Sequence, residues 1–124
     1  MLFYKCEKCG NFVAFIDKKP CVPQCCGQPM KELVAGETDG AVEKHVPAVT
    51  VDGNRVHVEV GSTLHPMEEK HYIQFICLET ETGFSLKKLA PGEAPVADFL
   101  LTDGEKAVAV YEYCNLHGLW KKDL

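Results

Sequence analysis

The sequence predicts a mainly β protein, in which an antiparallel β-sandwich follows a small N-terminal module held together by metal. Residues 46–124 contain short runs of β-branched and aromatic residues separated by Gly, Pro or Asp, and no run keeps a 3.6-residue apolar period. Five of the seven cysteines lie in residues 1–30, whereas all five histidines lie in residues 45–117. The first stretch is too short for an apolar core of its own, so we expect a metal ion to stabilise it.

A β-hairpin is the clearest element of the second part. The run RVHVEV, residues 55–60, alternates so that Val56, Val58 and Val60 share one face. The preceding VDGNR contains the Asp-Gly and Gly-Asn pairs of hairpin turns, which predicts strands over 46–51 and 55–60. Further strands are predicted in the segments YIQFICLET, GFSLKKL, ADFLL and KAVAVYEY.

The two parts meet in VAGETDGAVEK, residues 34–44, whose small and acidic residues are typical of a linker. We therefore predict two domains, residues 1–36 and 37–124. The unequal distribution of cysteine and histidine indicates a sulfur-rich metal site in the first domain and a nitrogen-rich site in the second.

The composition argues against several classes of function. The 124-residue chain carries a formal net charge of −5, whereas nucleic-acid-binding proteins usually present a basic face. It has no run of about 18 apolar residues, so no membrane span is expected. The N-terminal MLFYKCEKCG lacks the apolar region of a signal peptide, which predicts a cytoplasmic protein. In that reducing compartment clustered cysteines bind metal more often than they form disulfides.

The first predicted metal site is a cluster of four cysteines. CEKC supplies Cys6 and Cys9, and QCCG supplies Cys25 and Cys26 after fifteen intervening residues. Four thiolates suit tetrahedral zinc or iron. Adjacent cysteines cannot form the usual Cys-x-x-Cys knuckle, so we expect their sulfur–metal–sulfur angle to be strained open. A purely structural zinc site, a vicinal disulfide and ligation by Cys21 are the alternatives, and we interpret Cys21 as a spare thiol.

The second predicted metal site is built from histidines. His57 alternates with the apolar valines and is expected to face solvent rather than to bind metal. The other four lie at the ends of predicted elements, in EKHVP, HPMEEKH and YCNLHG, where sites are usually built. Four imidazoles and one thiolate exceed the tetrahedral set of structural zinc and leave one octahedral position for a small molecule. The predicted ligands are His45, His65, His71, Cys114 and His117.

The motifs CEKCGN, CCGQPM, EKHVP, HPMEEKHYI and YCNLHGLW resemble, in order and spacing, those of desulfoferrodoxin, the two-iron class of superoxide reductase. The resemblance covers essentially the whole chain. It implies a desulforedoxin-like N-terminal domain, an immunoglobulin-like β-sandwich, a homodimer, and rubredoxin or a similar small carrier as electron donor. It also implies two iron ions per chain, one bound by the four cysteines and one by four equatorial histidines with Cys114 as the axial ligand.

The reaction implied by the resemblance is the one-electron reduction of superoxide to hydrogen peroxide at the ferrous centre of four histidines and one cysteine, with the four-cysteine iron as an electron-transfer centre. Lys44 is expected to attract superoxide and aid protonation of the product, and Glu43 to occupy the sixth position of the ferric site. The alternative for Glu43 and Lys44 is an ordinary exposed ion pair. Cys77, in an apolar strand, is expected to be a small buried residue.

Three other functions stay open on the sequence: a non-catalytic electron carrier or iron-dependent sensor, a structural zinc protein, and a dismutase. An electron carrier would need only the sulfur site, so this function does not explain the four histidines. A structural zinc protein would be colourless and without redox response, and a dismutase would release dioxygen.

Overall fold

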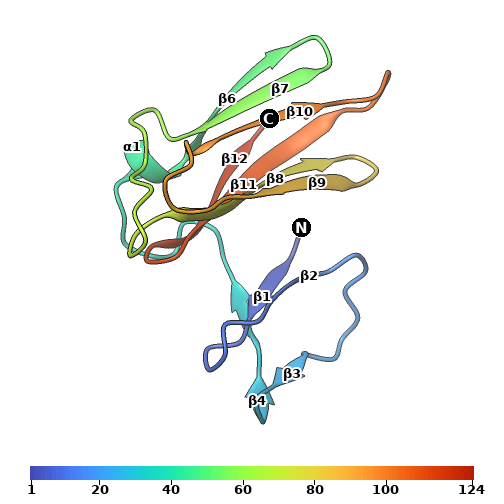
Figure 1. Ribbon diagram of the computed structural model, residues 1–124. Coiled ribbons are helices and arrows are strands. Elements are labelled where there is room, and N and C mark those ends of the chain that lie inside the picture. The colour runs from blue at the N-terminus through green and yellow to red at the C-terminus, as the bar shows by residue number, and fades with distance from the viewer. The chain divides into compact units, whose positions relative to one another are not determined.

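The computed structural model describes residues 1–124, which form twelve strands and one short helix (Figure 1). The predicted mainly β fold is confirmed. The chain divides into two compact units, Met1–Val34 and Ala35–Leu124, whereas the sequence prediction places the boundary between residues 36 and 37. No helix has the length and apolar character needed to cross a membrane.

The first unit is a small antiparallel sheet with an additional hairpin. The sheet has the order β2-β1-β5, and the hairpin pairs β3 with β4. The strands are β1 (Phe3–Lys5), β2 (Phe12–Ala14), β3 (Gln24–Cys25), β4 (Gln28–Pro29) and β5 (Lys31–Leu33). Its buried centre contains Tyr4, Cys6 and Met30, with Val13 and Phe15 packed against them. So few apolar side chains do not stabilise a domain alone, which agrees with a need for metal.

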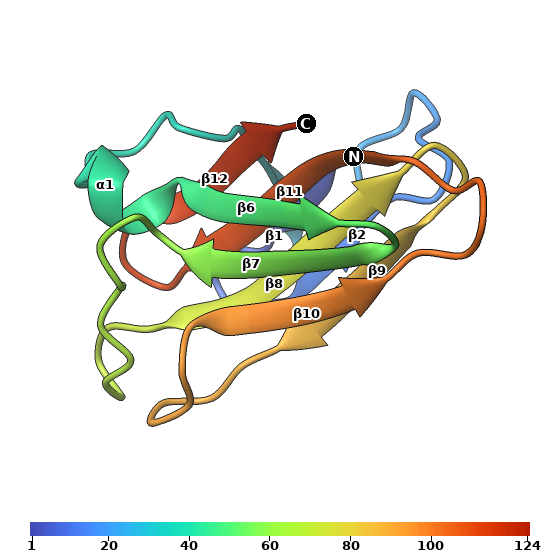
Figure 2. The ribbon, with the colours of Figure 1, turned by 90° about the horizontal axis from the view of Figure 1, so that it is seen from above.

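The second unit is a two-layer antiparallel sandwich (Figure 2). Three strands form one sheet in the order β10-β7-β6, and four form the other in the order β12-β11-β8-β9. The strands are β6 (Pro47–Asp52), β7 (Arg55–Val60), β8 (Ile73–Thr80), β9 (Phe84–Lys88), β10 (Val96–Leu100), β11 (Ala107–Cys114) and β12 (Gly118–Asp123). These include the predicted hairpin, in which β6 and β7 pair with Val51 opposite Val56.

Alternation along β7 shows why this sequence folds as a sandwich. Val56, Val58 and Val60 are fully buried between the sheets, whereas His57 and Glu59 lie on the outer face. Burying three valines contributes several kcal/mol through the hydrophobic effect, at about 1.5–3 kcal/mol each. A register slip by one residue would exchange the two faces, so this pattern sets the pairing.

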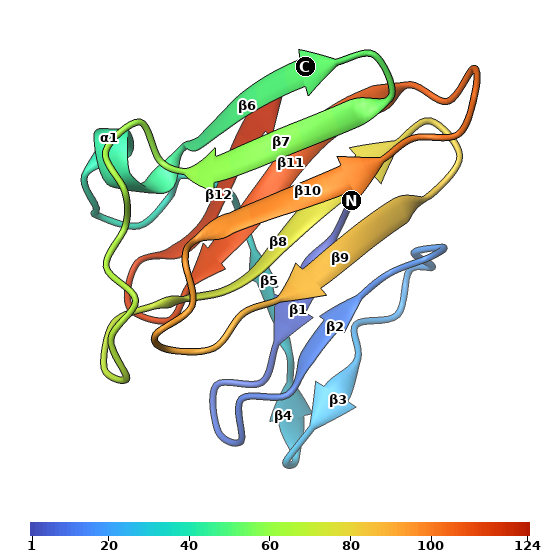
Figure 3. The same ribbon diagram turned by 45° about the horizontal axis from the view of Figure 1, so that its top comes forward.

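The segment predicted as a linker belongs largely to the second unit. The Gly36 amide donates to the Leu119 carbonyl, and the Thr38 hydroxyl donates to the His117 carbonyl. The segment ends in the helix α1 (Val42–His45). Figure 3 shows α1, the β7–β8 connection and the β11–β12 turn at the same end of the sandwich. The sequence predicts a linker over residues 34–44, and in the structure the part of this segment from Ala35 onward belongs to the second unit.

Candidate metal centres

Four histidines and one cysteine converge at this end of the sandwich. His45 ends α1, His65 and His71 lie in the β7–β8 connection, and Cys114 and His117 flank the turn between β11 and β12. Each residue offers one ligand atom, and the five atoms lie within 4.8 Å of one another. All five sequence-predicted residues of this site, called the histidine centre below, are thus brought together from three separate segments of the chain.

The four imidazoles form a square. Neighbouring ring centroids are 4.5–4.9 Å apart and the rings are nearly perpendicular, in the cyclic order 45, 65, 71, 117. His45 and His71 lie across the diagonal, with centroids 6.4 Å apart and rings inclined by 29°. The arrangement places four nitrogen donors around one centre, as an equatorial set requires.

The distances between nitrogens fit a metal ion. The Nε2 atom of His45 lies 3.1 Å from Nε2 of His65 and 3.0 Å from Nδ1 of His117. Adjacent donors of a square set with metal–nitrogen bonds of about 2.1 Å are separated by about 3.0 Å. Nε2 of His71 is buried and has no hydrogen-bond partner, which is costly for a neutral protein but is satisfied by a cation.

Backbone carbonyls orient two of the rings. Nδ1 of His45 lies 2.8 Å from the Ala41 carbonyl, and Nδ1 of His65 lies 2.6 Å from the Pro66 carbonyl. A carbonyl only accepts, so each Nδ1 carries the proton and each Nε2 presents its lone pair to the centre. The tautomers required for metal binding are therefore set by the fold.

Burial favours the neutral form of His45, His65 and His71. Burial lowers the pKa of His65 to about 4 and is the largest cause of the lowered pKa values of His45 and His71. The charge of Lys44 also lowers the pKa of His45 and of His71. Neutral imidazoles are the form that binds metal, so the site is ready for a cation at neutral pH.

The thiol of Cys114 lies in the turn that also carries His117. β11 ends at Cys114, and β12 begins opposite it at Gly118, whose φ of +78° allows the tight turn. Burial raises the pKa of the Cys114 thiol, whereas the backbone N–H groups of His117 and Leu116 lower it. These donors point at the sulfur and stabilise its thiolate, as they would in a metal-bound cysteine.

Three residues that support this site were not identified from the sequence. The indole of Trp120 stacks on His45 with ring centroids 5.0 Å apart, and its Nε1–H donates to the His117 carbonyl at 2.9 Å. The Thr38 hydroxyl donates to the same carbonyl. A Cβ atom at Gly40 would lie 3.0 Å from Trp120 Cζ2. The Trp three residues after His117 was the available signal, but only the fold shows that residues 38 and 40 reach it.

A buried carboxyl also lies close to the site in sequence. Glu112, two residues before Cys114 on β11, is fully buried, and neither carboxyl oxygen has a hydrogen-bond partner. Burial raises the pKa of Glu112 well above the ordinary value, which favours the neutral carboxyl group.

Glu43 and Lys44, the two residues predicted to act on substrate, are exposed and lie on α1 directly before His45. Glu43 lines a surface hollow of about 570 Å³ together with Val46, Ser62 and others. No ligand residue lines that hollow. The Lys44 charge acts on His45 and His71, as described above, which places its ammonium group within electrostatic reach of the site.

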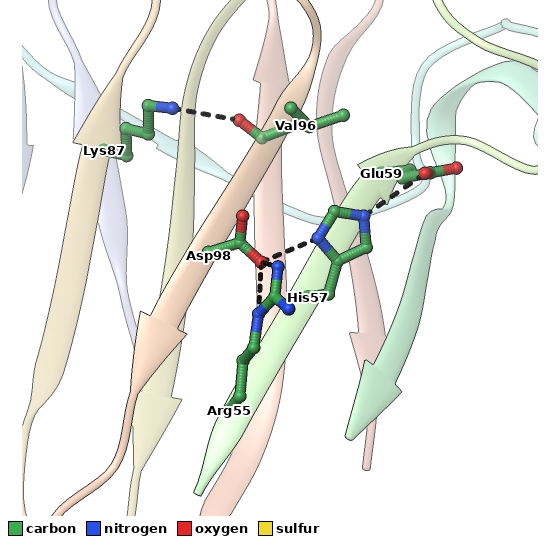
Figure 4. Close-up of polar contacts among 6 residues, drawn as sticks. All are labelled: Arg55, His57, Glu59, Lys87, Val96 and Asp98. Atoms are coloured by element: carbon green, nitrogen blue, oxygen red, sulfur yellow. Dashed lines mark hydrogen bonds and ion pairs between the residues drawn. The ribbon is translucent and has the colours of Figure 1, made fainter. Parts of the chain in front are cut away.

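His57 faces outward as predicted, and it is not among the five clustered residues. Figure 4 shows it between two carboxylates on the outer face of the three-stranded sheet. Nδ1 lies 2.7 Å from Asp98 and Nε2 lies 3.2 Å from Glu59, while Arg55 donates to the same Asp98 oxygen at 2.8 Å. Asp98 raises the pKa of His57 most, followed by Glu59.

The four predicted cysteines of the first unit also form a cluster, called the sulfur centre below, with their sulfurs within 4.8 Å of one another. The sulfurs of Cys9 and Cys25 are 3.6 Å apart, and those of Cys25 and Cys26 are 3.9 Å apart. A regular tetrahedral site with bonds of about 2.3 Å gives about 3.8 Å. The adjacent pair thus comes close to tetrahedral spacing, and the strain lies mainly in the backbone, where Cys26 has a φ of +53°.

The electrostatics of this cluster favour a cation. The Cys9 backbone N–H is the main reason why the pKa of Cys6 falls to about 6, whereas the Cys9 thiol is the first cause that raises the pKa of Cys26 to about 12. One thiolate therefore forms readily, and the crowding opposes ionisation of the next. A metal ion removes that opposition. Cys9 and Cys26 are exposed, so this centre is open to solvent on one side.

The two remaining cysteines lie outside both clusters. Cys77 is fully buried on β8, as predicted, and burial raises its thiol pKa to about 12. Cys21 is exposed and is not among the clustered sulfurs, in agreement with its interpretation as a spare thiol.

Comparison with known proteins identifies the family. Residues 37–123 match the family model of desulfoferrodoxin. This chain belongs to the desulfoferrodoxin family. It is 50% identical over 121 residues to the desulfoferrodoxin of Nitratidesulfovibrio vulgaris, covering 97% of this chain and 94% of that protein.

Solved structures agree with this assignment. The superoxide reductase of Treponema pallidum matches with a TM-score of 0.80 and 37% identity, over 92% of this chain and 93% of its own. The superoxide reductase (1Fe-SOR) of Giardia intestinalis matches with a TM-score of 0.58 and 36% identity, over 66% of this chain and 97% of its own. The donor sets of the histidine centre and the sulfur centre are those of a two-iron desulfoferrodoxin.

Proposed function

We propose that this chain is a superoxide reductase, which reduces superoxide to hydrogen peroxide at the histidine centre and uses the sulfur centre as an accessory electron-transfer site. The square of four imidazoles with one cysteine sulfur carries this conclusion. Five protein donors leave one octahedral position for a small molecule, unlike a closed structural site. The solved structures with the same fold and substantial identity are superoxide reductases, which supports the proposal.

Iron held by these five residues would supply the electron in a reaction that combines superoxide, one electron and two protons into hydrogen peroxide. The residues of the chain set the charge and the electron density around that iron. Burial favours the neutral form of His45, His65 and His71, and the thiolate of Cys114 is the one anionic donor in the set. The N–H groups of Leu116 and His117 moderate the electron density on that sulfur.

Lys44 is the residue that we propose attracts the substrate. Superoxide is an anion and the chain has a net charge of −5, so a local positive charge must provide the attraction. Lys44 is exposed and its charge acts on two of the ligands, and its ammonium group is also a proton donor for the product. We expect Lys44→Ala to slow superoxide capture by about tenfold at low ionic strength.

The control for this variant is Lys106→Ala, which removes the same charge from an exposed position in the connection between β10 and β11. Pulse radiolysis at several salt concentrations measures capture, and metal analysis checks that the iron content is unchanged. Equal capture rates for wild type and Lys44→Ala at low salt would contradict the role of this residue.

For Glu43 we propose that its carboxylate occupies the sixth position in the oxidised protein. Its side chain is exposed, so it can change rotamer at little cost. The visible spectrum of oxidised Glu43→Ala should differ from that of wild type, whereas the reduced proteins should react with superoxide at similar rates. Identical oxidised spectra would exclude Glu43 as a ligand.

The yield of peroxide tests the reaction itself. Fully reduced, iron-loaded protein is mixed with superoxide in the absence of dioxygen. One peroxide per superoxide, without dioxygen, is expected of a reductase. Half that yield with dioxygen release would identify a dismutase, and no reaction above the spontaneous rate would leave an electron carrier or a structural metal protein.

We further propose a small electron carrier such as rubredoxin as the donor, a homodimer as the assembly and the cytoplasm as the location. The family resemblance and the clustered reduced cysteines support these proposals. Reduction of the oxidised protein by purified rubredoxin and a sedimentation measurement test the first two.

A further inference from the structure

We infer that the turn Gly61–Thr63 is a positioning element that holds α1, and with it Lys44, against the metal site. The turn is distant from α1 in sequence and contributes no ligand. The inference rests on the proposed function, because the consequence of positioning Lys44 is capture of superoxide.

The helix α1 cannot hold its own position. It is four residues long, and no side chain caps its first turn. On their own, helices shorter than about 12 residues are only marginally stable, because forming the first turn fixes several residues for one hydrogen bond. The orientation of Glu43 and Lys44 must therefore be set by whatever contacts α1.

The turn supplies two hydrogen bonds to one carbonyl of α1. The Thr63 backbone N–H donates to the Glu43 carbonyl at 2.9 Å, and the Ser62 hydroxyl donates to the same oxygen at 3.2 Å. That carbonyl belongs to the peptide bond that joins Glu43 to Lys44. Two donors on this peptide fix its plane and so restrict where the Lys44 side chain begins.

The turn is itself tied to a metal ligand. The Gly61 N–H donates to the Thr63 carbonyl at 3.2 Å, and the His65 N–H donates to the Val60 carbonyl at 2.7 Å. The segment that presents His65 is therefore the same one that holds the residue preceding Lys44. One turn thus couples the position of the charged side chain to the ligand square.

Gly61 packs closely against the backbone of α1 and of the residue that follows it. A Cβ atom at this position would lie 2.7 Å from the Glu43 carbonyl oxygen, 2.9 Å from the Val46 carbonyl oxygen and 3.0 Å from the Lys44 carbonyl carbon. All three atoms are backbone, so no side chain can rotate away to relieve the clash. An alanine here must displace α1 or the turn.

The test is a double-mutant cycle between the turn and Lys44, measured as the rate constant for superoxide capture by the iron-loaded protein. We expect Gly61→Ala to slow capture by up to about tenfold, the loss expected when Lys44 itself is removed. The rate constant for capture by Gly61→Ala should also depend less on salt concentration than that of wild type, as expected for Lys44→Ala. Because the turn acts through Lys44, the double variant should be no slower than Lys44→Ala. Effects that multiply, or an unchanged salt dependence, would overturn the inference.

Two further variants keep the test decisive. Ser62→Ala removes only the hydroxyl donor and should slow capture by about threefold, with the same non-additivity toward Lys44→Ala. It replaces Gly61→Ala in the cycle if that variant does not fold. The matched control is Gly83→Ala, where a Cβ meets no atom within 4 Å and φ lies outside the left-handed region. We expect it to behave as wild type.

Amide hydrogen exchange of Thr63 provides a readout that does not depend on superoxide. It should become faster in Gly61→Ala and stay unchanged in Gly83→Ala, because only the first disturbs the bond to Glu43. Faster exchange with wild-type capture would overturn the positioning role and leave the proposed function intact. A wild-type protein that does not reduce superoxide would instead overturn the proposed function.

Discussion

Replacing Gly40 by alanine tests whether the segment before α1 is packed against the metal site. In the structure, the added Cβ atom would lie 3.0 Å from Trp120 Cζ2, 3.2 Å from His45 Cε1 and 3.3 Å from His117 Cβ. Carbon atoms in contact are normally about 3.5–4.0 Å apart. One methyl group would therefore push on two ligands and on the indole that stacks on one of them.

The expected losses of stability and of iron affinity follow from these short contacts. Overpacking a filled site costs about 1–3 kcal/mol. For a unit of about 90 residues, 1 kcal/mol lowers the unfolding temperature by about 4–8 °C. Disturbing groups that orient metal ligands lowers metal affinity by about 10- to 100-fold. We therefore expect Gly40→Ala to unfold at least about 4 °C below wild type and to bind iron at the histidine centre at least about tenfold more weakly.

Thermal unfolding followed by circular dichroism measures the first effect, and iron competition with a chelator measures the second. Gly83→Ala is the control, because its methyl group enters open space. Tryptophan fluorescence reports directly on the indole, since Trp120 is the single tryptophan of the chain. An unfolding temperature and an iron affinity equal to those of wild type would refute the packing described for Gly40.

Two further predictions concern the outer face and the first unit. The pKa of His57 is raised in the fold, mainly by Asp98. The pairing of protonated His57 with Asp98 therefore stabilises the protein fully below the unfolded pKa of about 6.5, and this stabilisation is lost as the pH rises through the folded pKa. His57→Gln should therefore cost stability at about pH 5.5, by at most about 1 kcal/mol, and little at about pH 9; an equal cost at both pH values in urea unfolding would contradict this. Cys26→Ser removes one of the four sulfurs of the first unit, so iron content should fall to about one ion per chain while superoxide reduction is retained if that centre is accessory. Loss of superoxide reduction in the variant would show that the sulfur centre is required.

The sequence alone was sufficient for the fold class and for both donor sets. Strict alternation in RVHVEV indicated the hairpin, because period-two patterning determines which face of a strand is buried. Short spacings such as CEKC and YCNLHG indicated ligands, because neighbouring donors reach one metal with little contribution from the rest of the fold. His57 was separated from the ligands by the same alternation. These features depend on residues that are close together in the chain, so the sequence alone predicts them.

Only the tertiary structure decided which distant residues support the site. Trp120, Thr38 and Gly40 meet at His117 because the segment before α1 lies along the end of the sandwich, and no local pattern encodes that path. The cyclic order of the four imidazoles likewise depends on contacts between segments that are far apart in the chain. The physical reason is that packing and hydrogen bonds across the fold act through space, whereas a sequence pattern reports directly only on neighbours along the backbone.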